Sequence, residues 1–191
     1  MKRWWHKAPW VAVVGLGLSL AVVGGSGAPP GSSLTMRLAG PLAGPLAAAQ
    51  WVRVDLAMRA GRTELALARA ETAFALNPTA TSGWFFLSRH LAFDLASSER
   101  EPEAAVRLRW VQAALAIAER GERTADDPAE LAFWQGLVLA RTAEVDAELG
   151  WEGGGAGMWS AAAEHFERAA RAGHPEAAAA ASLARRERDS R

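Results

Sequence analysis

The chain has four histidines, the side chains best suited to bind a metal or to transfer a proton near neutral pH. They are His6, His90, His165 and His174. No two of them form an HxxxH or HExxH pattern, and the sequence has no cysteine to complete a zinc site. His90 lies beside an apolar helical stripe, which favours a partly buried helix residue over the alternative of a catalytic one. The sequence therefore predicts no metal site and no cofactor.

One glycine-rich stretch, GWEGGGAG at 150–157, has the composition of a phosphate-binding loop. A P-loop needs Lys and Ser or Thr after its glycines, whereas Met158 and Trp159 follow here and no strand is expected before it. A connector between helices is the better interpretation. GLGLS at 15–19 lies in an apolar segment and lacks the strand-to-helix turn of a hydrolase nucleophile.

The acidic residues near 119–127, in ERGERTADD, are interpreted as a solvated loop that ends in a helix cap. Nowhere does the sequence bring together a nucleophile, a base and oxyanion donors in a recognisable motif. It therefore predicts a protein that is not an enzyme.

The charges of the chain balance overall but are unevenly distributed. Because 21 Lys and Arg offset 21 Asp and Glu, no general affinity for nucleic acid is expected. No acidic residue precedes Asp55, while three basic residues stand at the N-terminus: Lys2, Arg3 and Lys7. Of the 21 basic residues 19 are arginine, which indicates a bacterium with GC-rich codons.

Residues 1–28 join this basic start to an uncharged apolar run. The run is about 20 residues long, enough to cross the hydrocarbon core of a bilayer as a helix. Its basic end carries three tryptophans of the kind that form an aromatic belt: Trp4, Trp5 and Trp10. Because positive charges favour the cytoplasmic side, the segment is predicted to be a transmembrane signal anchor with the body of the chain outside the cytoplasm.

A cleaved signal peptide is the alternative to an anchor. The triplet SGA at 26–28 has the small residues of a cleavage site, although Pro29 directly after it disfavours cleavage. Residues 29–46 are rich in Gly, Pro and Ser and include the tandem AGPLAGPL, so they are predicted to be a linker.

From residue 47 onward, apolar residues recur at helical spacing. The stripes are Ala47, Trp51, Val54 and Met58; Ala66, Ala70 and Ala73 with Leu67 and Phe74; Trp84, Leu87, Leu91 and Leu95; and Leu131, Trp134 and Val138. Gly61 and Asn77-Pro78 are predicted to end the first two helices, since proline cannot continue the helical hydrogen bonds. Asp127 is a predicted N-cap, followed by Pro128 at the first helical position. The sequence thus predicts an all-α body over 47–186 and a polar tail at 187–191.

Two segments of this body resemble known helical repeats. The first resembles the tetratricopeptide repeat, whose unit of about 34 residues packs small residues of one helix against a Trp and a Leu of another and ends near a proline. The residues in register are Gly61, Ala66, Ala73 and Pro78, then Trp84 and Leu87 in a unit that begins at Thr81. ERAARAGHPEA at 167–177 resembles the Sel1-like repeat, in which Gly173 ends one helix and alanines begin the next. Neither repeat pattern fits the sequence well between roughly residues 97 and 155.

The resemblance implies a short α-solenoid of antiparallel helix pairs, preceded by the transmembrane helix. In tetratricopeptide proteins, ligands lie on the concave face and contact fixed positions of the first helices. In this register those positions are Ala48, Trp51, Asp55 and Met58, then Ser82, Phe85, Arg89 and Ala92. The resemblance therefore implies a groove for a peptide or helix formed by Trp51, Asp55, Met58, Phe85 and Arg89. The alternative places Trp51 and Met58 in the core, because both lie on a stripe predicted to be buried.

The predicted function is protein–protein interaction, as a scaffold or as an assembly or accessory subunit of a bacterial envelope complex. The expected location is the inner membrane, with one membrane span and the body in the periplasm, and the expected partners are other proteins. Two alternatives stay open. One is a soluble secreted or periplasmic adaptor, if the N-terminus is cleaved. The other is a helical domain that binds a small apolar ligand.

Overall fold

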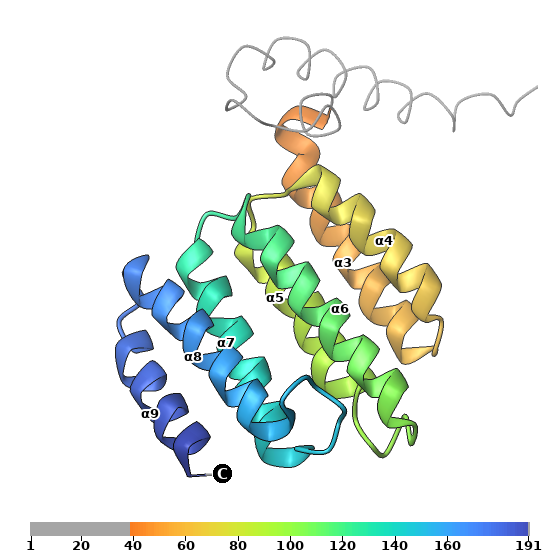
Figure 1. The fold of residues 1–191 in the computed structure, drawn as a ribbon. Coiled ribbons are helices and arrows are strands. Elements are labelled where there is room, and N and C mark those ends of the chain that lie inside the picture. The colour runs from red at the N-terminus through yellow and green to blue at the C-terminus, as the bar shows by residue number, and fades with distance from the viewer. Residues whose placement is uncertain (1–38, 191) are drawn as a thin grey trace, which may run out of the picture. The chain divides into compact units, whose positions relative to one another are not determined.

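The computed structural model describes residues 39–190, and all regular structure within this range is helical (Figure 1). Its elements in chain order are η1 (Gly40–Leu42), α3 (Ala43–Arg59), α4 (Thr63–Leu76), α5 (Thr81–Arg89), η2 (His90–Leu95), α6 (Ala104–Glu122), α7 (Pro128–Val145), α8 (Gly154–Arg171) and α9 (Ala177–Asp189). The predicted all-α class is confirmed for this part of the chain. The described residues divide into two compact units, the first ending at Pro78 and the second beginning at Thr79.

The predicted membrane anchor lies outside the described residues, as do its named side chains, Lys2, Arg3, Lys7, Trp4, Trp5 and Trp10. Among the helices of residues 39–190, none is long and apolar enough to cross a bilayer. The predicted linker at 29–46 is too long at its C-terminal end, because α3 begins at Ala43. Pro45 lies in the first turn of this helix, where a backbone N–H has no helical partner, so proline is tolerated there.

In the first unit, α3 and α4 form an antiparallel pair joined by a tight turn at Gly61 (Figure 1). Gly61 has φ +69°, and its N–H donates to the Met58 carbonyl at 2.9 Å, which ends α3 as predicted. The second helix ends at Leu76, directly before Asn77-Pro78. The side chains of Ala66, Ala70 and Ala73 are fully buried, as the stripe pattern predicts.

In the second unit, α5 packs on α6, α7 lies against α6 and α8, and α9 packs on α8. The predicted cap of α7 is confirmed, because the Asp127 carboxylate accepts a hydrogen bond from the Glu130 N–H at 2.9 Å. Gly173 has φ +96° and ends α8, and the alanine run that follows forms α9. This helix continues to Asp189, so most of the predicted polar tail is helical.

Two glycines of this unit allow large rings to lie directly against a helix backbone. A Cβ added at Gly136 of α7 would lie 2.6 Å from the Phe166 ring of α8. A Cβ added at Gly121 of α6 would lie 2.5 Å from Cγ of Trp84 of α5. Both distances are too short for real atoms, so any side chain at these positions pushes the paired helices apart.

The Gly136→Ala variant is expected to lower the free energy of unfolding by about 1–3 kcal/mol, because the added methyl group overpacks the contact with Phe166. Chemical denaturation followed by circular dichroism measures this change. The control is Gly44→Ala, which adds the same group to a helical position with no other atom within 4 Å. An equally small effect of both variants would contradict the close packing of α7 on α8.

Candidate functional site

In the first unit, the predicted binding residues do not form an open groove. Met58 is only 5% exposed, so the core interpretation holds for it. Trp51 is half-buried, with its ring edge-on to Phe74 at a centroid distance of 5.3 Å. Asp55 accepts a hydrogen bond from the Arg59 guanidinium one turn later, at 2.8 Å. Trp51 and Met58 therefore pack within the α3–α4 pair, and Asp55 is paired within α3.

In the second unit, Phe85 and Arg89 lie one turn apart on the side of α5 that faces α7. The Phe85 ring contacts Trp134 of α7 at a centroid distance of 4.3 Å and is half-buried. The Arg89 side chain is exposed, and within residues 39–190 its guanidinium makes no hydrogen bond or ion pair. Phe85 thus offers an aromatic ring in a fixed position, and Arg89 offers an unpaired cation one turn away.

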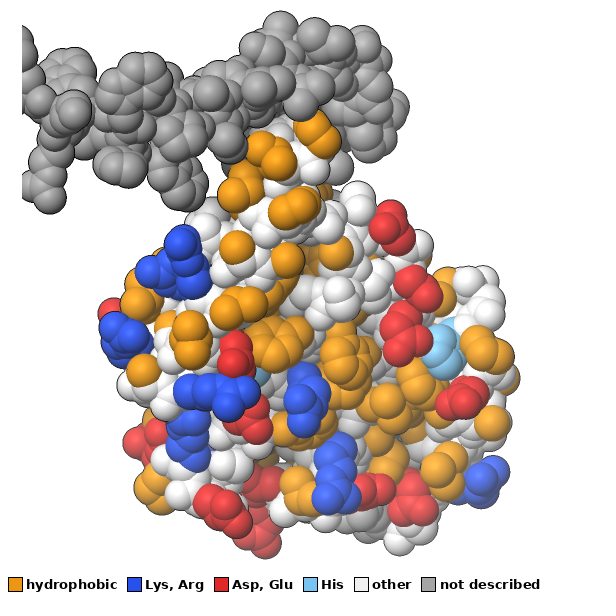
Figure 2. Space-filling model, turned by 180° about the vertical axis from the view of Figure 1, so that it is seen from behind, with side chains coloured by type: hydrophobic (Ala, Val, Ile, Leu, Met, Phe, Trp, Pro, Cys, Tyr) orange, Lys and Arg blue, Asp and Glu red, His pale blue; other side chains and the backbone are white. Residues whose placement is uncertain are grey.

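Two further apolar residues extend this surface. Phe93 of η2 lies edge-on to Trp134 at a centroid distance of 5.6 Å, and Leu137, one turn after Trp134, is 38% exposed. We call Phe85, Arg89, Phe93, Trp134 and Leu137 the α5–α7 face. Figure 2 shows the side of the molecule opposite to Figure 1, where hydrophobic side chains run together between separate charged groups.

The π-helix η2 carries Phe93, a further side chain of this face. Its wider turn is visible in the hydrogen bond from the Ala96 N–H to the Leu91 carbonyl, five residues earlier, at 3.1 Å. Ala92, which the repeat register implied for the binding face, is buried, and its neighbour Phe93 contacts Trp134 instead. Phe93 was not among the predicted residues, because the repeat register selects Ala92.

A buried chain of hydrogen bonds holds Trp134 in place. The Trp134 indole N–H donates to the Ser88 hydroxyl at 2.9 Å. That hydroxyl donates in turn to the Ala114 carbonyl of α6, also at 2.9 Å. Three helices therefore fix the orientation of the ring on which Phe85 and Phe93 pack.

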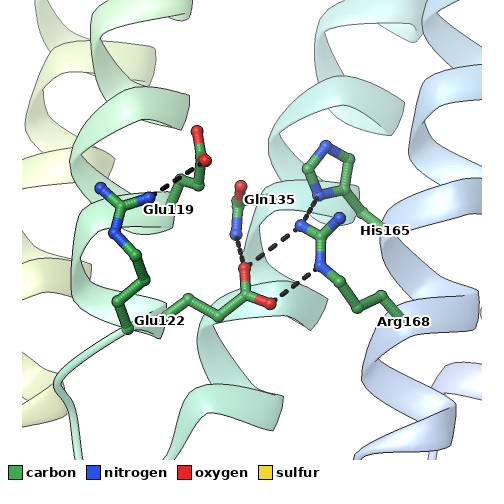
Figure 3. Close-up of a pocket in the computed structure, with 6 residues that line it drawn as sticks. Glu119, Glu122, Gln135, His165 and Arg168 are labelled. Atoms are coloured by element: carbon green, nitrogen blue, oxygen red, sulfur yellow. Dashed lines mark hydrogen bonds and ion pairs between the residues drawn. The ribbon is translucent and has the colours of Figure 1, made fainter.

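A cluster of polar side chains joins α6, α7 and α8 (Figure 3). The Glu122 carboxylate accepts hydrogen bonds from Arg168 at 2.8 and 3.2 Å and from the Gln135 amide at 2.8 Å. Arg168 also contacts His165 Nδ1 at 2.7 Å. We call Glu122, Gln135, His165 and Arg168 the polar cluster. It borders a hollow of about 510 Å³ that Glu119 and Arg123 also line.

The sequence interpretation of 119–127 as a solvated loop is wrong at its start, because α6 continues to Glu122. The pKa of His165 is lowered from 6.5 to about 4, mainly by burial and next by the adjacent Arg168 cation, against the raising effect of Glu122 and Glu119. The imidazole is thus neutral near pH 7, and its Nδ1 accepts from Arg168. No Ser, Thr or Cys lines the hollow, and its two carboxylates, Glu119 and Glu122, are paired with Arg123 and Arg168.

The other two described histidines have structural partners. His174 stacks on Phe133 at a centroid distance of 4.0 Å, and its Nε2 lies 3.2 Å from the Glu130 carboxylate. His90 Nδ1 lies 2.6 Å from Asp94 within η2. No group of three or more His, Asp or Glu side chains within residues 39–190 is placed to hold a metal ion.

A second hollow, of about 680 Å³, lies between the end of η2, α6 and α7. At its edge Arg107 donates to the Asp146 carboxylate at 2.8 and 2.9 Å and to the carbonyls of Glu101 and Pro102. Arg107 therefore joins α6 to the loop before it and to the residue that directly follows α7.

Comparison of the chain with protein-family models, curated proteins and solved structures gives no match. The resemblance to tetratricopeptide and Sel1-like repeats therefore stays a prediction.

The lowered pKa of His165 predicts a specific dependence of stability on pH. In the unfolded chain this histidine takes up a proton near pH 6.5, whereas in the folded chain it does so only near pH 4. Stability is therefore expected to be fully present above pH 6.5 and to fall as the pH drops toward 4, by on the order of 3 kcal/mol in total.

The measurement is the free energy of unfolding of the chain and of His165→Gln at several pH values between 4 and 7. The difference between the two proteins is expected to shrink as the pH falls through this window. A difference that does not change with pH would show that His165 titrates alike in the folded and unfolded chains.

Proposed function

We propose that this protein is a non-catalytic scaffold that binds a helical or extended segment of another protein on its α5–α7 face. The observation that carries the proposal is the pairing of fixed, partly exposed apolar side chains with the unpaired guanidinium of Arg89. Aromatic and Arg side chains of this kind are enriched among the residues that dominate binding energy at protein interfaces.

The rigidity of the face supports this proposal. Phe85 and Phe93 both pack on Trp134, whose indole is held by Ser88, so the rings lose little conformational freedom when a partner binds. Leu137 extends the apolar surface by one turn along α7. An amphipathic segment suits this arrangement, with its apolar side chains against the rings and an acidic side chain opposite Arg89.

The proposed setting is a bacterial envelope complex, with the chain anchored in the inner membrane by residues 1–28 and its body in the periplasm. The apolar run and the basic N-terminus in the sequence support this setting. The side chains of the polar cluster bond to one another, which supports a structural role for that cluster and leaves the α5–α7 face as the candidate binding surface.

The test is affinity capture of the C-terminally tagged full chain from its own membranes in mild detergent, with partners identified by mass spectrometry. A partner recovered with the chain is expected to be lost or strongly reduced with Arg89→Glu and with Leu137→Ala. Both side chains are exposed enough to be changed without opening the core, and reversal of a charge opposite an acidic partner group adds repulsion.

Arg109→Glu is the matched control, because it makes the same change of charge at an exposed arginine of α6. Equal loss of the partner with Arg109→Glu would point to net charge instead of the α5–α7 face. Recovery of the chain alone, or of the same partners with every variant, would contradict the proposed function.

A further inference from the structure

The first unit carries an apolar surface on the side of α3 turned away from its buried residues. Ala43, Ala47, Val54, Ala57 and Met58 form the buried side of the helix. Leu42 of η1, directly before the helix, is 49% exposed. On the other side of α3, Leu46, Val52 and Leu56 are between 46% and 62% exposed. At 100° per residue they fall within about a third of the helix circumference. A helix that is apolar on both sides is typical of one that is covered on both sides.

The end of this surface is basic. Leu56 and Leu65 of α4 line a groove of about 430 Å³ together with three arginines: Arg53, Arg62 and Arg69. Within residues 39–190 none of the three guanidinium groups makes a hydrogen bond or an ion pair. The acidic residues of α3 and α4 are Asp55, Glu64 and Glu71, and none of them lines the groove. The surface therefore presents apolar side chains and uncompensated positive charge together.

We propose that this surface, formed by α3 and the start of α4, lies on an anionic lipid bilayer. The leucines and Val52 would enter the boundary between headgroups and acyl chains, and the three arginines would bind lipid phosphates. Arginine suits this position because its aliphatic stem covers apolar surface while its guanidinium reaches the charged layer. The proposal does not depend on the partner-binding role of the α5–α7 face.

The position of α3 in the chain supports a bilayer as the occupant. It is the first described α-helix after the apolar segment at 1–28, and 14 residues separate Ala28 from Ala43, as residues 29–42. Even fully extended, 14 residues span at most about 50 Å. If residues 1–28 cross a membrane, α3 is held within that distance of its surface.

The shape of the surface also favours lipid over a protein partner. Its apolar residues are all aliphatic and are spread from Leu42 to Leu56, without the fixed aromatic rings that mark the α5–α7 face. A stable protein interface concentrates its binding energy in a few buried anchors, whereas a bilayer accepts any apolar stripe of sufficient area.

The natural chain has no cysteine, so a single label reports on one position. The Leu56→Cys variant of the full chain carries an environment-sensitive fluorophore and is placed in lipid nanodiscs of phosphatidylcholine with roughly a third phosphatidylglycerol. A matched control is Leu183→Cys on α9, whose native side chain is 48% exposed, against 58% for Leu56.

The label at position 56 is expected to show a blue-shifted emission that is quenched by brominated lipid, while the label at position 183 shows neither. Combined replacement of Arg53, Arg62 and Arg69 by glutamine, or removal of phosphatidylglycerol, is expected to abolish both signals. Emission at position 56 like that at position 183 would overturn the proposal. A blue shift without quenching by brominated lipid would also overturn it, because protein would then cover the surface.

Discussion

The second unit depends on the close approach of helices where one of them has no side chain. Gly121 leaves room for Trp84, and Gly136 leaves room for Phe166. A ring that fills a glycine-sized gap fixes both the distance and the register of the two helices, since any slip brings the ring against a Cβ. Buried alanines such as Ala114, at 0% exposure, are also small enough to let helices lie close together away from these rings.

This packing leaves other aromatic side chains at the surface in fixed positions. Trp84 and Phe166 fill the interfaces within helix pairs, whereas Phe85 and Phe93 rest on Trp134 between α5 and α7. The side chains of the polar cluster, in contrast, already have hydrogen-bond partners. Glu122, Gln135, His165 and Arg168 bond to one another, so they join three helices and leave little capacity for a ligand. Among the described residues, the exposed and unpaired groups are thus the better guide to function.

Local patterns in the sequence predict much of this fold, because apolar stripes, the Asp127 cap and the glycine ends of α3 and α8 each depend on residues close in the chain. The spacing of Phe85 and Arg89 also predicts that they lie one turn apart on one helix, and α5 contains both. The π turn was not predicted, since the stripe of Trp84, Leu87, Leu91 and Leu95 has the spacing of a regular α-helix. The outer surface of α3 was missed because Leu42 and Leu46 were assigned to the predicted linker at 29–46, and the one buried stripe left Leu56 unexplained.

The central claim is that the α5–α7 face contacts another protein. Site-specific photocrosslinking tests it most directly, with a photoreactive amino acid at position 89 in the full chain in its own membranes and the same group at position 109 as reference. The account predicts a discrete crosslinked product with one protein from position 89 and none from position 109. No product at position 89, or the same products from both positions, would contradict it.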